Sequence, residues 1–208
     1  MIRSLYQLTT KINSHIEKLH HIRDFKLNEI KPIVNDYMSN DWEEYKNKNP
    51  VKHLSFSNNY SRIPIMFDKL ENGKKDLYDM FLIVWEPNCH TSIHNHPDGD
   101  CIMKVLEGNI IEQRFQNNET CSEVKCLRVD DISFMSDNIG LHRIINSNDT
   151  NSYSLHIYSP PIYYPEFEHE LKKHNLEFFK KTPFLARSMM LDKKENIMHY
   201  SSKQRDLP

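Results

Sequence analysis

Residues 90–108 read HTSIHNHPDGDCIMKVLEG and place two histidines, a turn and an apolar run in direct succession. In an extended chain, residues two apart point to the same face, so His94 and His96 can present two imidazoles to one metal ion. Pairs of this kind also occur by chance on exposed strands. Pro97-Asp98-Gly99 is a turn signal, and the apolar run that starts at Cys101 ends at Gly108. The stretch therefore predicts β-strands around a candidate metal site.

Short β-rich runs separated by turn residues continue on both sides of this stretch. Seven or more such strands with no helices between them predict an antiparallel sandwich or small barrel. We therefore expect an all-β core over residues 54–161. The runs are YDMFLIVWE (78–86), CIMKVLEG (101–108), NIIEQRF (109–115), VKCLRV (124–129), ISFMS (132–136), HRIIN (142–146) and YSLHIYS (153–159).

Helical periodicity is found in residues 1–50. A first helix is predicted from apolar residues at spacings of three and four, namely Leu5, Leu8, Ile12, Ile16 and Leu19. A second helical stretch is expected after Pro32, carrying Val34, Tyr37, Met38 and Trp42 until the polar run KNKNP (46–50). Residues 162–181 are compatible with a further short helix. We expect residues 1–208 to form a single domain in which residues 162–208 are a C-terminal extension.

Composition excludes several classes of protein. The formal charge is −2, with 27% charged and 38% hydrophobic residues among 208, which argues against a disordered acidic tail and a non-specific nucleic-acid binder. No run of 18 apolar residues occurs, so neither a signal peptide nor a membrane span is expected. The chain is therefore predicted to be cytoplasmic, with its four cysteines as free thiols. Cys121 and Cys126 have no nearby histidine, which gives little support for zinc between them.

A third histidine extends the pattern, in Gly140-Leu141-His142. The order His94-x-His96, Cys101, Gly108 and then His142 resembles the cupin family, whose first motif is H-x-H followed by a glutamate and a glycine. Cys101 stands where cupins usually have the glutamate ligand. Three neutral histidines would leave the full 2+ charge on an ion, which favours an anionic thiolate as a further ligand.

Further motifs resemble cysteine dioxygenase, a family within the cupins. The resemblance covers about half of the chain, from Tyr60 to Pro161. It rests on Cys101 together with Tyr60-Ser61-Arg62, Trp85, Asp137-Asn138-Ile139-Gly140-Leu141-His142-Arg143 and Ser154-x-His156-x-Tyr158-Ser159-Pro160-Pro161. It implies a cupin-type antiparallel β-barrel, the double-stranded jelly-roll, with N-terminal α-helices.

The resemblance also implies a role for each site residue. His94, His96 and His142 match the metal ligands, for one Fe(II) per chain. Arg62 matches the clamp for a substrate carboxylate, and Tyr60 supports the same end of the substrate. The remaining matches are catalytic: Cys101 and Tyr158 correspond to the pair that the family joins as a thioether crosslink, and His156 orients the tyrosine hydroxyl.

The reaction implied is the addition of O2 to the sulfur of L-cysteine, which gives cysteine sulfinic acid at the start of cysteine catabolism toward taurine and sulfate. A monomer is expected, with no nucleic-acid or membrane partner. Alternatives are a dioxygenase for 3-mercaptopropionate or cysteamine, and a non-catalytic metal-binding cupin. A zinc-dependent isomerase is disfavoured because the glutamate ligand is absent.

Without the resemblance, each residue also has a purely structural interpretation. Arg62 alone is compatible with a solvated surface charge. Cys101 is compatible with a small buried apolar residue, and Tyr158 with a core residue whose polar tip is satisfied. Trp85 is expected to serve packing rather than chemistry, and His90 to lie in a loop outside the site.

Overall fold

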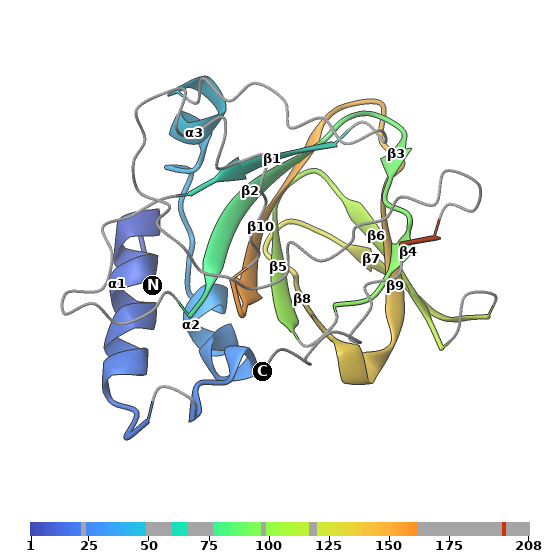
Figure 1. Cartoon of the computed structure of the whole chain (residues 1–208). Coiled ribbons are helices and arrows are strands. Elements are labelled where there is room, and N and C mark those ends of the chain that lie inside the picture. The colour runs from blue at the N-terminus through green and yellow to red at the C-terminus, as the bar shows by residue number, and fades with distance from the viewer. Residues whose placement is uncertain are drawn as a thin grey trace, which may run out of the picture.

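The fold consists of two facing β-sheets with helices along the outer side of one sheet (Figure 1). The structure is a computed structural model and describes residues 1–21, 24–48, 60–65, 77–96, 99–116, 120–161 and 197–198. The helix expected over 162–181 lies outside these residues. Among the described residues, no helix is long and apolar enough to cross a membrane.

The first sheet has five antiparallel strands. Strand β10 lies between β2 and β5, so it pairs with two strands that are far from it in sequence. In sheet order the strands are β1 (Tyr60–Pro64), β2 (Asp79–Trp85), β10 (Ser152–Ser159), β5 (Asp100–Glu107) and β8 (Ile132–Ser136).

The second sheet faces the first and carries the two histidine segments. Its strands are antiparallel except at β11, which pairs parallel to β4. In sheet order they are β11 (Ile197–Met198), β4 (Ile93–His94), β9 (Leu141–Asn146), β6 (Ile110–Phe115) and β7 (Cys121–Leu127), with β3 (Cys89–His90) also paired to β9.

This arrangement is the double-stranded β-helix of the cupins, so the expected fold class is confirmed. All seven β-rich runs form strands. Strand β1 was not predicted, because its sequence YSRIP is too polar and too short to show a strand pattern. His90, expected in a loop, lies in the two-residue strand β3 instead.

The first predicted helix is confirmed as α1 (Leu5–Glu17), whose N-cap Ser4 accepts a hydrogen bond from the Gln7 backbone N–H. The second prediction was wrong in its length. Helix α2 (Lys31–Asn35) ends early, and α3 (Glu43–Lys48) forms separately. The cause is tertiary pairing. Ile2 forms a parallel bridge with Tyr37, with its N–H donating to the Asp36 carbonyl at 2.7 Å and its carbonyl accepting from Met38 N–H at 2.9 Å. The described residues also include the short 3-10 helices η2 (Leu27–Ile30) and η3 (Asp137–Ile139).

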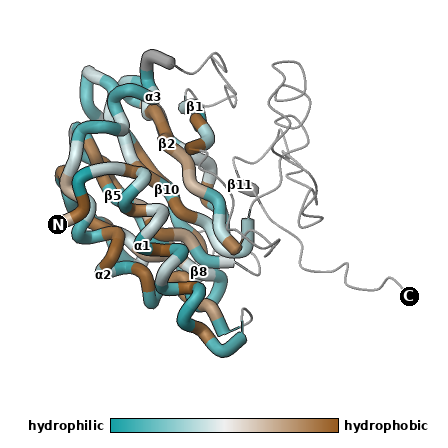
Figure 2. Tube along the Cα trace, turned by 90° about the vertical axis from the view of Figure 1, so that its left-hand side faces the viewer, coloured by the Kyte–Doolittle hydropathy of each residue, from teal (hydrophilic) through white to brown (hydrophobic). Residues whose placement is uncertain are grey.

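The first sheet is buried on both faces. Met80 and Leu82 of β2 join the cluster under the helices, whereas Phe81, Ile83 and Trp85 join a second cluster between the sheets. Burial on both faces explains why YDMFLIVWE is apolar throughout rather than alternating. Figure 2 shows brown, hydrophobic segments in β2 and β10 as well as in α1 and α2.

A fully buried lysine links the sheet to the helices. Lys104 of β5 is 0% exposed, and its Nζ donates to the carbonyls of Asn35 at 3.1 Å and Tyr37 at 2.6 Å. Its charge is balanced by the Asp130 carboxylate, 3.2 Å away. These carbonyls lie at and just beyond the end of α2, where helix carbonyls lack internal partners, and Lys104 provides a donor to both.

Replacing Lys104 with methionine should lower the free energy of unfolding by about 1–3 kcal/mol, because the buried Tyr37 carbonyl loses its donor while the aliphatic volume is kept. Urea unfolding measures the change. The control is Lys125→Met on β7, where a 38% exposed lysine pairs with Glu123 at the surface and contributes little. Equal stability of the two variants would contradict the linking role of Lys104.

Candidate metal centre

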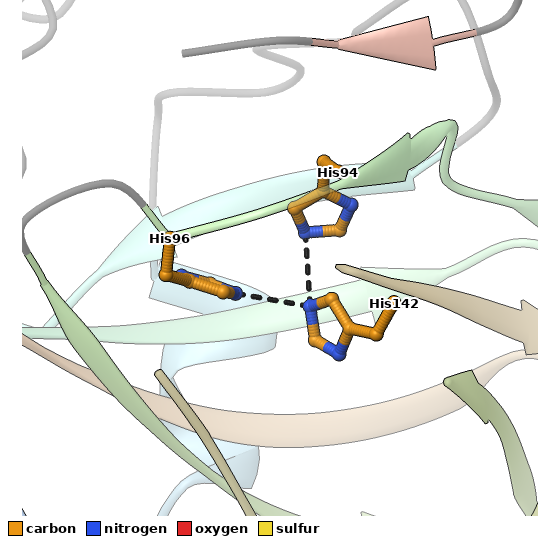
Figure 3. A group of neighbouring side chains, drawn as sticks. All are labelled: His94, His96 and His142. Atoms are coloured by element: carbon orange, nitrogen blue, oxygen red, sulfur yellow. Dashed lines mark hydrogen bonds between the residues drawn. The ribbon is translucent and has the colours of Figure 1, made fainter. Parts of the chain in front are cut away.

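Three histidines converge between the two sheets. His94 ends β4, His96 follows two residues later, and His142 lies in β9 as the Cα partner of His94. The Nε2 atom of His142 is 2.9 Å from that of His96 and 3.0 Å from that of His94, and Figure 3 draws both contacts as dashed lines. His94 and His142 are buried and His96 is partly buried.

The outer ring nitrogens of two of these histidines are already engaged. Nδ1 of His94 lies 3.0 Å from the Ser92 carbonyl, and Nδ1 of His142 lies 3.0 Å from the Glu112 carboxylate. Both partners are acceptors, so each Nδ1 carries the proton and each Nε2 presents a lone pair. Burial lowers the pKa of His94 and His96 well below the ordinary range, and the neighbouring His142 lowers both further, which keeps these rings neutral.

This donor set fits a metal ion. The Nε2 atoms of the three rings meet at about 3 Å, so one cation between them could accept a lone pair from each. Imidazole nitrogens lie about 2.0–2.1 Å from a first-row metal, which makes separations near 3 Å between adjacent ligands reasonable. His94, His96 and His142 are also the group in the described part of the chain whose ligand atoms lie close enough to hold one ion.

The segments that carry the ligands are held by two local features. Asn95, between the first two histidines, donates from Nδ2 to the Asp137 carboxylate at 3.1 Å in η3. Gly140, just before β9, has a φ of +116°, and a Cβ atom there would lie 2.7 Å from the Phe115 carbonyl oxygen. Only glycine fits this turn without a shift of backbone.

Arg62 and Tyr60 lie on the same face of β1, and both are buried. The Arg62 guanidinium carbon is 5.7 Å from the centre of the Tyr60 ring and 6.0 Å from that of Tyr158. Burial lowers the pKa of His156, and the positive charge of Arg62 lowers it further. A permanent positive charge therefore lies in the interior beside the histidines.

A chain of hydrogen bonds leads from Trp85 to Tyr158. The Trp85 indole N–H donates to Ser154 Oγ at 2.8 Å, and Ser154 Oγ lies 2.9 Å from His156 Nε2. Ser154 is fully buried, and among the described residues His156 Nε2 is the acceptor in reach of its hydrogen. His156 Nε2 therefore accepts, and its Nδ1–H faces the Tyr158 hydroxyl at 3.2 Å.

Cys101 and Tyr158 are directly opposite each other on β5 and β10. Burial raises the pKa of the Cys101 thiol, although a hydrogen bond with Tyr158 opposes the shift. The Cys101 sulfur is also 3.6 Å from His156 Nδ1. The Tyr158 ring stacks on that of His96, with ring centres 5.8 Å apart, which brings this pair next to the histidine triad.

All eight residues singled out from the sequence thus face one interior. The structure adds Glu112 of β6, which sequence reasoning missed. Its side chain is 1% exposed and accepts from His142 and, at 2.6 Å, from the Ser133 hydroxyl. The sequence could have indicated its burial, because Glu112 is two residues after the buried Ile110 in NIIEQRF and therefore lies on the same face of the strand. The structure also gives the Trp85 indole a polar contact where only packing was expected.

Other histidines and cysteines lie apart from the site. His90 is exposed, and its Nδ1 contacts the Thr91 carbonyl at 2.9 Å. Cys121 and Cys126 are both exposed free thiols on β7, as expected from the sequence. The fold and the triad together define this chain as a cupin whose three histidines could hold a metal ion.

Comparison with known families makes the assignment more specific. A family model described as cysteine dioxygenase type I matches residues 8–168. The chain therefore belongs to the cysteine dioxygenase type I family, as the motifs indicated.

Curated relatives cover different shares of the chain. Cysteine dioxygenase type 1 of Rattus norvegicus is 36% identical over 97 residues, which are 43% of this chain and 47% of the relative. The Homo sapiens protein is 35% identical over the same shares. The Danio rerio protein is 29% identical over 159 residues, covering 70% of this chain and 73% of the relative. The match thus spans about half the length of the mammalian relatives.

Solved structures with a similar fold are more distant. The protein TT1209 from Thermus thermophilus has a TM-score of 0.43 and 16% identity, covering 59% of this chain and 96% of its own. A Klebsiella pneumoniae protein with a double-stranded beta-helix domain has a TM-score of 0.41 and 17% identity, covering 57% of this chain and 85% of its own. These likenesses concern the fold alone.

Anaerobic addition of Fe(II) should raise the midpoint of thermal unfolding, because an ion bound only by the folded state stabilises it, by about 2.7 kcal/mol at 100 times Kd. His142→Ala should abolish this metal-dependent rise. The matched control is His90→Ala, which removes an exposed histidine outside the triad and should keep the rise. A metal-dependent rise in His142→Ala equal to that of the unsubstituted protein would contradict the assigned site.

Proposed function

We propose that this chain is a thiol dioxygenase that adds both atoms of O2 to the sulfur of L-cysteine and forms cysteine sulfinic acid. The observation that carries the proposal is the arrangement of Arg62, the Cys101 and Tyr158 pair, and the three histidines around one buried interior. The reaction balances as RSH + O2 → RSO2H, so no further reductant is required. Membership in the cysteine dioxygenase type I family supports it.

The metal proposed is Fe(II), held by His94, His96 and His142. When bound, it would coordinate the substrate thiol, lower the pKa of that thiol and supply the electrons through which O2 reacts. The three ligands are neutral, so the centre keeps its full charge toward an anionic substrate. The role of the protein is to place the sulfur and O2 beside each other, where they need not meet by diffusion.

Arg62 is proposed to bind the substrate carboxylate. A guanidinium presents a planar fork of donors that matches a carboxylate, and in a buried site this pairing is strengthened by the low dielectric. Tyr60 and Tyr158 flank the guanidinium and would limit where the carboxylate can lie. A thiol that also carries a carboxylate is therefore favoured over cysteamine, which has none.

Tyr158 is proposed to hold a hydrogen bond to the substrate or to O2. His156 donates from Nδ1, so the Tyr158 oxygen accepts and its own hydrogen is directed to another acceptor. The direction of these hydrogen bonds is set by Trp85, because an indole N–H can only donate. Ser154 accepts from Trp85 and donates to His156. The side chains therefore orient one hydroxyl hydrogen beside the histidine triad without any proton transfer.

The decisive experiment is anaerobic loading of the purified chain with Fe(II), followed by L-cysteine and O2 and identification of the product. Cysteine sulfinic acid formed with one O2 consumed per thiol supports the proposal. Faster turnover of 3-mercaptopropionate or cysteamine would favour one of those substrates instead. Oxygen uptake with none of the three thiols would favour a non-catalytic metal-binding cupin. The monomeric state and the cytoplasmic location stay predictions.

Arg62→Ala should lower kcat/KM for L-cysteine by about 100-fold or more, since removal of one partner of a buried charge pair costs about 2–5 kcal/mol. Turnover of cysteamine, which has no carboxylate, should change much less. Steady-state oxygen uptake with the two thiols measures the difference. Arg128→Ala, at an exposed arginine, is the control and should alter neither rate. Equal losses for both thiols in Arg62→Ala would exclude the clamp role.

The crosslink between Cys101 and Tyr158 is proposed separately. Their Cα atoms are partners across β5 and β10, which places both side chains on one face. Formation of a thioether joins sulfur to the tyrosine ring and removes one hydrogen from each, with O2 as the acceptor of both. After many turnovers, intact mass should be lower by two hydrogen atoms, and Tyr158→Phe should show no deficit. An unchanged mass in the unsubstituted protein would remove the crosslink and leave the site assignment in place.

A further inference from the structure

The buried carboxylate of Glu112, which contacts the candidate metal ligand His142, has no role in the function proposed so far. Glu112 lies on β6, where its neighbour Arg114 is the Cα partner of His142 on β9. The Glu112 side chain is 1% exposed. Burial of a carboxylate is costly unless its charge is paired and its oxygens are hydrogen-bonded, so its position requires a reason.

The two oxygens of Glu112 have separate tasks. Oε1 contacts only His142 Nδ1, at 3.0 Å, among the described residues. Oε2 accepts from the Ser133 hydroxyl at 2.6 Å and from Arg114 Nε and Nη2, both at 3.2 Å. Arg114 is itself fixed, because its Nη2 also donates to Ser133 Oγ at 3.0 Å and to the Phe134 carbonyl at 2.9 Å. One oxygen therefore anchors the carboxylate, and the other is presented to the metal ligand.

We propose that Glu112 is a positioning residue for the metal centre, which orients His142 through Nδ1 and supplies a negative charge to it across the imidazole ring. The inference rests on the proposed metal site and goes beyond the roles given above. His142 then differs from His94, whose Nδ1 donates to a neutral carbonyl, that of Ser92. A carboxylate partner makes an imidazole a better donor to a metal, and loss of such a partner commonly costs about 10- to 100-fold in affinity.

The location of this charge bears on the chemistry. A glutamate bound directly to the ion would cancel one unit of its charge and fill a coordination position. Cys101 stands at the usual place of that glutamate, so the position stays available for thiol or O2. Glu112 supplies a carboxylate one ring further out, where it strengthens the binding of the metal without taking a ligand position.

The first test is the equilibrium affinity for Co(II), an air-stable substitute for Fe(II), measured by competition with a chelator in the absence of thiol. Glu112→Gln keeps the size of the side chain and removes its charge, and it should raise the Kd by about 10- to 100-fold. The absorption bands of bound Co(II) should also shift, because the donor strength of one ligand changes. A Kd equal to that of the unsubstituted chain would overturn the inference.

A matched control separates positioning from general stability. Asp41 is a partly buried carboxylate far from the histidines in sequence, which accepts from the Tyr37 hydroxyl and the Leu5 N–H, both at 2.7 Å. Asp41→Asn makes the same chemical change and should lower the stability of the metal-free protein while keeping the Co(II) affinity. Equal losses of Co(II) affinity in Asp41→Asn and Glu112→Gln would mean that Glu112 acts only through folding, which overturns the inference.

A measurement on the unsubstituted protein covers the case in which Glu112→Gln does not fold. In the Zn(II)-loaded chain, nitrogen NMR should show His142 coordinated through Nε2, with a proton on Nδ1 in a strong hydrogen bond. Coordination through Nδ1 would overturn the inference. Neither measurement involves catalysis. If the Fe(II)-loaded chain takes up no oxygen with any of the three thiols while Co(II) binding behaves as expected, the proposed function is refuted and this inference stands. An unchanged Kd in Glu112→Gln refutes only the inference.

Discussion

The convergence of three imidazole nitrogens between the two sheets is the constraint on which the rest of the structure depends. His94 and His142 turn their Nε2 atoms toward each other, 3.0 Å apart, because Nδ1 of each ring faces an acceptor on the far side. The pairing of β4 with β9 brings the two rings together. The turn at Gly140 and the link from Asn95 to η3 keep those strands in place. In a centre of this kind, the free energy of folding holds the histidines together, and binding of a metal ion adds to the stability of the folded state.

The first sheet performs two tasks with alternate residues. On β10, Leu155 and Ile157 pack under the helices, while His156 and Tyr158 face the interior with the catalytic candidates. Strand geometry imposes this division, because successive side chains point to opposite faces. The helices therefore pack against the outer face of this sheet, and the strands in turn position the residues that point inward.

Much of this was predictable from the sequence, and the failures have physical causes. Short β-rich runs and turn residues located the strands, and the family motifs located the three histidines. The helix expected after Pro32 was divided because Ile2 pairs with Tyr37, a contact between residues far apart that local periodicity does not record. Glu112 was missed because its chemistry depends on the neighbouring strand. A glutamate in NIIEQRF has the same local pattern whether its partner is water or a metal-ligating histidine.

The sequence by itself determined the strand pattern, the spacing of the candidate ligands and the family, since these depend on residue type and order along the chain. Only the tertiary structure decided which polar groups meet: Glu112 with His142, Trp85 with Ser154, and Lys104 with the end of α2. The reason is that a buried polar side chain must find its partner wherever the fold brings one, and these partners lie 30, 69 and 67 residues away. Short-range order sets the elements, and long-range contacts set the protonation and orientation on which the chemistry depends.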